Sequence, residues 1–169
     1  MARARRRAKS AGEESGLGLS LTPTEFLVLA TVRARLDAIL RNPSSAKAIV
    51  DRLFPPAFPD NAEAEATHRA LIGSSMLEAR KESLAAFEAT LASARPRGGS
   101  VGVELDGAGV DLWLHVLNDF RLLHGTELGI DDDDWSWEGS EDPAAAASYG
   151  FYWTLTGIQS VLLDALDGD

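Results

Sequence analysis

The 169-residue chain contains no cysteine. Without cysteine, a protein has no disulfide scaffold, no thiol nucleophile and no thiolate metal site. The sequence also lacks any apolar run that approaches the roughly 20 residues needed to span a bilayer. No apolar segment follows the basic N-terminal residues, as it would in a secretory signal. We therefore expect no membrane contact and a cytoplasmic location.

Short motifs of common active sites are missing as well. Ser74 and Ser75 do not stand in a GxSxG elbow, and the glycines at 98–99 and 107–109 form neither a GxGxxG nor a Walker pattern. The four aspartates at 131–134 lack the alternating spacing and central glycine of a calcium-binding loop. We predict no catalytic residue and no cofactor.

Charge is distributed unevenly along the chain. The first ten residues carry five positive charges and no acid, so a formal net charge of −10 leaves −15 on the remaining residues. Residues 1–15 are predicted to be a disordered basic tail, and residues 16–169 a single helical domain. Because so acidic a domain repels nucleic acid, we expect such contact only non-specifically, through the basic residues 1–9.

Apolar periodicity and capping residues predict a mainly α fold. Thr22 and Glu25 form a capping box for the first helix, whereas Asp106 caps the third, which is predicted to end at a glycine cap at Gly125. Two alternating runs are predicted to pair as strands. The expected architecture is a compact bundle of about four helices, near 22–41, 60–94, 107–124 and 142–166, with a small two-stranded β ribbon, its strands near 17–21 and 101–105.

The third predicted helix has an apolar arc of about 200°, which is too wide for a helix resting on one neighbour. We therefore expect it to be the central helix. Arg121 falls inside this arc, and a buried charge without a partner costs several kcal/mol. We predict a structural ion pair between Arg121 and an acid on another element, without choosing among Asp37, Asp51, Asp119 and Glu127. The alternative is that Arg121 belongs to a functional site.

Two further groups of residues are candidates for function. His115, Asn118 and Asp119 lie on the narrow polar stripe of the third helix, where imidazole and carboxylate suit a metal ion, although a solvated face is the simpler interpretation. Trp135, Trp137 and Trp153 are candidates for an interaction surface, because aromatic side chains surrounded by charge are favoured at interfaces. The alternative is that these rings fold back over the core.

Several segments together resemble a known family. They are Leu-Thr-Pro-Thr-Glu at 21–25, Arg-Leu-Phe-Pro at 52–55, Phe-Pro-Asp at 58–60, Leu-Asn-Asp-x-Arg-Leu at 117–122 and Gly-Thr-x-Leu at 125–128. The chain is similar to an actinobacterial family defined by a domain of unknown function, whose genes often lie beside that of the Clp protease adaptor. The resemblance implies a small helical cytoplasmic protein. Some members are labelled transcriptional regulators, and no catalytic residue carries over.

These observations favour a non-enzymatic helical module for protein interaction or regulation, linked through the resemblance to regulated proteolysis. A protein partner is expected, and a homo-oligomer is left open. One alternative is a DNA-binding transcriptional regulator, although the predicted helices 107–124 and 142–166 offer no basic recognition surface. A second alternative is an enzyme or metal protein that uses the region of His115, Asp119 and Arg121.

Overall fold

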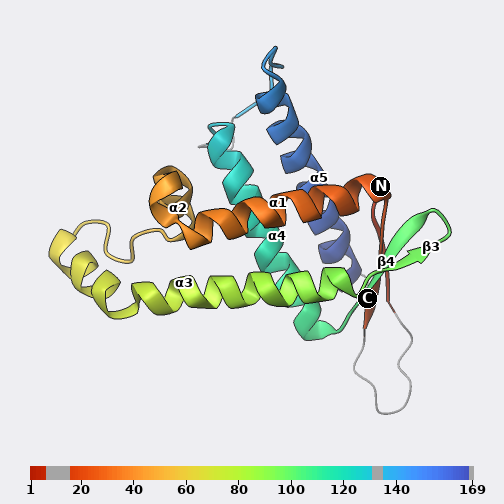
Figure 1. The fold of residues 1–169 in the computed structure, drawn as a ribbon, viewed down its shortest axis with the longest axis horizontal. Coiled ribbons are helices and arrows are strands. Elements are labelled where there is room, and N and C mark those ends of the chain that lie inside the picture. The colour runs from red at the N-terminus through yellow and green to blue at the C-terminus, as the bar shows by residue number, and fades with distance from the viewer. Residues whose placement is uncertain (7–15, 131–134, 168–169) are drawn as a thin grey trace.

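The computed structural model describes residues 1–6, 16–130 and 135–167. Within these ranges the chain is mainly α-helical, and a four-stranded sheet lies at one side of the helices (Figure 1). The helices are α1 (Pro23–Arg41), α2 (Lys47–Leu53), α3 (Ala62–Ala92), α4 (Gly107–Glu127) and α5 (Pro143–Asp167), with a short 3-10 helix η1 (Pro43–Ala46) before α2. The strands are β1 (Arg3–Arg6), β2 (Leu17–Leu21), β3 (Arg95–Arg97) and β4 (Ser100–Leu105). No helix in the described ranges has the length and apolar character needed to cross a membrane.

The sheet is antiparallel, in the order β1-β2-β4-β3. The predicted pairing of residues 17–21 with 101–105 is confirmed, since Leu17 lies opposite Leu105 and Leu21 opposite Val101. The prediction of only two strands is wrong, because β1 and β3 extend the sheet at either edge. Alternate residues of β2 are buried, so the helices cover one face of the sheet and leave the other open to solvent.

The predicted disordered tail includes an ordered strand. Residues 3–6 pair with β2, and Ala2 is 4% exposed. Periodicity did not indicate a strand here because the inward residues of β1 are small or charged. Arg6 donates its Nε–H to the carbonyl oxygen of Ala165 at 2.6 Å, near the C-terminal end of α5. Residues 7–15, the rest of the predicted tail, lie outside the described residues.

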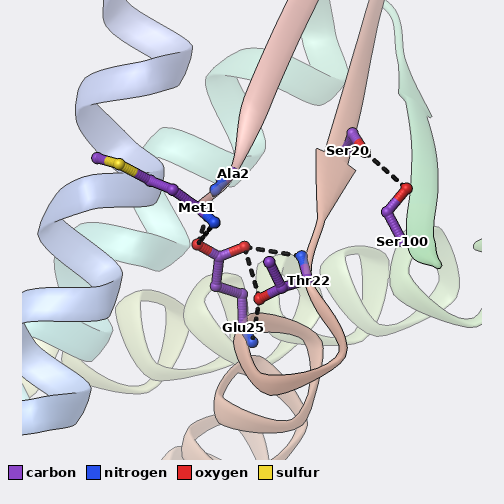
Figure 2. Close-up of polar contacts among 6 residues, drawn as sticks. All are labelled: Met1, Ala2, Ser20, Thr22, Glu25 and Ser100. Carbon is purple, nitrogen blue, oxygen red and sulfur yellow. Dashed lines mark hydrogen bonds and ion pairs between the residues drawn. The ribbon is translucent and has the colours of Figure 1, made fainter.

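The predicted capping box at the start of α1 is confirmed and also holds the first strand. Glu25 donates its backbone N–H to the Thr22 hydroxyl at 3.2 Å and accepts the backbone N–H of Thr22 at 2.8 Å. Its other carboxylate oxygen accepts the backbone N–H of Ala2 at 2.7 Å (Figure 2). One carboxylate therefore joins the N-terminus of α1 to the chain that leads into β1.

As predicted, α4 is the central helix. It contacts α1, α2, α3, α5 and β4. Trp113 and Phe120 of α4 are fully buried and meet Phe87 of α3, with ring centroids 4.6 and 5.5 Å from the Phe87 ring. Tilted and edge-on ring pairs of this kind are favourable beyond their buried area. The three rings fasten α3 and α4 to each other.

The predicted end of this helix at Gly125 is wrong by one turn. Gly125 is helical and buried, and a Cβ atom there would lie 3.7 Å from the Tyr152 ring. The left-handed residue after the helix is Gly129, with φ of 66°. Packing against α5 thus keeps Gly125 inside the helix, while Gly129 provides the backbone conformation that a non-glycine residue rarely adopts.

Candidate functional site: an exposed aromatic cluster

Arg121 joins α4 to α5, but not through the predicted carboxylate. It donates to the side-chain oxygen of Gln159 at 2.6 Å and to the Tyr152 hydroxyl at 3.3 Å, and its guanidinium carbon lies 5.4 Å from the Tyr152 ring centroid. The predicted acids pair with other cations: Asp37 with Arg41, Asp51 with Lys47, Asp119 with Arg80, and Glu127 with Arg35. The ion pair of Arg121 was a wrong prediction. Arg121 is partly buried, and neutral oxygens and a ring face take the place of an acid, although its Nε–H has no hydrogen-bond partner among the described residues.

The polar stripe of α4 does not converge on a common point. His115 is exposed, and its Nδ1 lies 2.7 Å from the carbonyl oxygen of Asp111, whereas Asn118 is exposed without a described hydrogen bond. Asp119 is buried and forms an ion pair with Arg80 of α3. Within the described ranges there is no group of three or more potential ligands placed to hold a metal ion.

A partly buried cluster around His124 has the residue types of a hydrolytic triad but not its geometry. The Nδ1–H of His124 donates to Glu127 at 3.0 Å, and the Ser148 hydroxyl donates to the same carboxylate oxygen at 2.7 Å. A triad needs serine and carboxylate on different ring nitrogens, and here both lie beside Nδ1, while Nε2 has no partner. The cluster therefore connects α4 to α5. Burial alone would raise the pKa of Glu127. The hydrogen bonds from His124 and Ser148, together with the charge of Arg35, have the opposite and larger effect, so the pKa lies below its ordinary value.

The three predicted tryptophans form an aromatic cluster with Tyr149. Tyr149 and Trp153 lie one turn apart on α5, with nearly parallel rings 6.3 Å apart at 17°. Trp137 stacks on Tyr149 at 4.5 Å and 7°, and Trp135 lies 6.2 Å from Trp137. We call Trp135, Trp137, Tyr149 and Trp153 the aromatic cluster.

The aromatic cluster is a surface feature and not part of the core. Trp153 is 65% exposed, and the other three rings are partly buried. None of the four packs against the described hydrophobic core, so the alternative that these rings cover the core is not what the structure shows. Sequence periodicity could not identify Tyr149 as a member of the cluster, because its membership depends on where the segment before α5 places Trp135 and Trp137.

Acidic residues lie close to the aromatic cluster in the sequence. Glu138, Glu141 and Asp142 are exposed in the segment that links Trp137 to α5. The four aspartates at 131–134 lie outside the described residues. Ring faces and carboxylates both attract cations, so the chemistry of this surface suits a guanidinium or ammonium group.

An apolar cavity between α1, α2 and α3 was not predicted. It has about 620 Å³ of space, its open mouth included, and its apolar lining includes Leu40, Val50, Phe54, Met76 and Leu77. At its rim, Arg69 donates to the carbonyl oxygen of Phe54 at 2.7 Å and to Glu65 at 2.6 Å. Hydrogen bonds from Arg69 and from the backbone of Phe58 lower the pKa of Glu65. Because these charges are paired, the cavity offers mainly apolar contact.

The fold and surface define a mainly α domain with a one-sided antiparallel sheet and an exposed aromatic cluster. Residues 2–166 match the family described as Domain of unknown function (DUF2017), so the chain belongs to that family. No curated protein and no solved structure matches the chain.

Proposed function

We propose that this protein is a non-enzymatic interaction module that binds a basic segment of a partner protein on the aromatic cluster. The observation that carries the proposal is the gathering of four aromatic rings at the surface, three of them stacked, with Trp153 65% exposed. Large aromatic side chains are frequent anchors of protein interfaces. Contiguous apolar surface is typical of interaction sites.

Charge supports a basic partner. From residue 122 to residue 169 the sequence contains no lysine or arginine and eleven acidic residues. The described acids next to the aromatic cluster, Glu138, Glu141 and Asp142, are exposed. A cation held over an exposed ring gains about 0.5–1 kcal/mol, and neighbouring carboxylates add attraction that falls with rising salt.

Binding of a fluorescently labelled peptide tests the proposal. A short peptide of alternating arginine and serine is titrated with the full chain, and its anisotropy is compared with that of a peptide in which glutamate replaces arginine. Trp153→Ala is expected to weaken binding of the basic peptide at least fivefold. Its effect on the free energy of unfolding should stay within about 0.5 kcal/mol, since surface substitutions usually do.

Leu163→Ala is the matched control, because Leu163 is also an exposed apolar residue of α5, at 44% exposure. It should bind the basic peptide as the unmodified protein does. Equal binding of the basic and acidic peptides, or full binding by Trp153→Ala, would contradict the proposal.

We also propose that this interaction serves regulated proteolysis in the cytoplasm of an actinobacterium. The support is the resemblance to a family whose genes often lie beside that of the Clp protease adaptor. This support is independent of the geometry of the aromatic cluster. Degradation of a model substrate by purified Clp protease and adaptor, with and without the protein, is the test. An unchanged rate together with no binding to either component would refute this part.

A further inference from the structure

We infer that the solvent face of the sheet binds the phosphate backbone of nucleic acid. This site is separate from the aromatic cluster. Arg6 of β1 contacts Ala165 at the C-terminal end of α5, whereas Tyr149 and Trp153 lie toward its N-terminal end. At 1.5 Å per residue, Trp153 and Ala165 are about 18 Å apart along the helix. The inference does not rest on the proposed function.

Strand register places four arginines on this face. Arg3 lies opposite Ser20 and Arg5 opposite Gly18, and directly opposed residues of an antiparallel pair point to the same side. Since Leu17, Leu19 and Leu21 point into the core, Ser20 and Gly18 point to solvent. On the other edge, Arg95 lies opposite Gly102 and Arg97 opposite Ser100, so these two arginines share the same face. We call Arg3, Arg5, Arg95 and Arg97, with the strand residues between them, the basic face.

The arginines flank a floor of small residues and one acid, Glu104, which lies opposite Gly18. The two central strands contribute Gly18, Ser20, Ser100 and Gly102, and the hydroxyl groups of Ser20 and Ser100 are hydrogen-bonded at 2.9 Å (Figure 2). From β1 to β3 the face spans three interstrand spacings, or about 14 Å, and arginines two residues apart on one strand are separated by about 6.6 Å. That separation is comparable to the distance between successive phosphates of a nucleic acid strand.

The fold does not require the two glycines of this floor. A Cβ atom at Gly18 would lie 3.5 Å from its nearest neighbour, a Glu104 oxygen, and one at Gly102 would lie 3.6 Å from the Arg97 side chain, both ordinary contact distances. Neither glycine has a positive φ angle. Glycine inside a strand weakens a sheet and often marks a place where a ligand approaches the backbone closely.

The chemistry of the basic face fits phosphate better than an acidic protein segment. Protein interfaces need apolar contact area at their centre, and the outward residues of the described strands are arginine, serine and glycine, with Glu104 the one acid. Guanidinium groups form paired hydrogen bonds with phosphate oxygens. The face carries four arginines and one acid, Glu104, which lies 3.7 Å from Arg97, so its net charge is positive. The face has no aromatic ring on which a base could stack, so we expect contact with the backbone and no sequence preference.

A salt titration with a labelled 20-base-pair DNA duplex tests the inference. Three to four phosphate contacts predict a slope of about −2.7 to −3.6 for the logarithm of the binding constant against the logarithm of salt concentration. Arg95→Ala combined with Arg97→Ala should reduce the slope to about half and weaken binding at least tenfold at low salt.

The matched control is Arg41→Ala combined with Lys47→Ala, which removes the same charge from side chains 74% and 82% exposed on α1 and α2. This control should retain the slope. The inference is overturned if the control weakens binding as much as the substitutions at Arg95 and Arg97 do. It is also overturned if only Arg3→Ala with Arg5→Ala reduces binding, or if polyglutamate competes equally well per charge.

Discussion

The ion pair between Arg80 of α3 and Asp119 of α4 gives the sharpest prediction about stability. The Asp119 side chain is 6% exposed, whereas Arg80 is 32% exposed. Arg80 also donates to the carbonyl oxygen of Leu53 at 3.4 Å and lies over the Phe54 ring. Removal of Arg80 would therefore leave a buried carboxylate without its cation, and removal of Asp119 would leave a cation that reaches water.

The two removals should have unequal effects. Breaking a buried pair by deleting one partner costs about 3–5 kcal/mol. We expect Arg80→Leu to lower the free energy of unfolding by about 3 kcal/mol at neutral pH, near the lower end of that range because Asp119 can bind a proton instead. Asp119→Leu should cost about 1 kcal/mol, and the double variant should be close to the unmodified protein, because replacement of both charges is often neutral.

The pH dependence has a definite sign. Burial raises the pKa of Asp119 above its ordinary value of 3.8, despite the opposing charge of Arg80. An acid with a raised pKa contributes stability that is present below the unfolded-state pKa and is lost as pH rises through the folded-state pKa. Without Arg80 the folded-state pKa rises further, so Arg80→Leu should lose stability progressively as pH increases above about 4.

Urea unfolding followed by circular dichroism at several pH values provides the measurement. Arg80→Lys is the control that retains the positive charge, and its loss should be the smaller one. Three results would refute the reasoning: equal losses for Arg80→Leu and Asp119→Leu, strictly additive losses in the double variant, or a loss for Arg80→Leu that is independent of pH.

Three other substitutions have directions fixed by their surroundings. The lowered pKa of Glu127 gives stability that is present above the ordinary pKa of 4.5 and is lost as pH falls through the folded-state pKa, so Glu127→Gln should flatten the acid side of a stability profile measured by urea unfolding. Gly73 lies within α3, and a Cβ atom there would have no neighbour within 4 Å; Gly73→Ala should raise the free energy of unfolding by about 0.5–1 kcal/mol, and a lower melting temperature would contradict this. Phe87 is fully buried between Trp113 and Phe120, so Phe87→Ala should cost about 3–5 kcal/mol in chemical denaturation, and a cost below about 1 kcal/mol would show that the core collapses around the gap.

Local signals in the sequence predicted local structure well. Thr22 and Glu25 marked the start of α1, and Asp106 marked the start of α4, because capping depends on residues three positions apart. The wide apolar arc of α4 likewise identified the central helix, since the number of neighbours determines how much of a helix surface must be apolar.

Predictions that depended on distant residues were less successful. The partner of Arg121 is Gln159, 38 positions away, and no local pattern distinguishes a neutral amide there from an acid elsewhere. Strand β3 contains Pro96 between two arginines and forms only because β4 offers a free edge. The three tryptophans were candidates for an interaction surface, but no sequence pattern indicated that their rings lie together or that Tyr149 joins them.

The contact between Arg6 and α5 has a consequence for the order of folding. It joins residues 159 positions apart, and the helix that supplies the carbonyl of Ala165 is the last described element to be synthesised. Contacts of such long sequence separation form late, after shorter loops have closed. Strands β1 and β2 are therefore synthesised well before the helix that β1 contacts, and β1 can complete its native contacts only after α5 has been made.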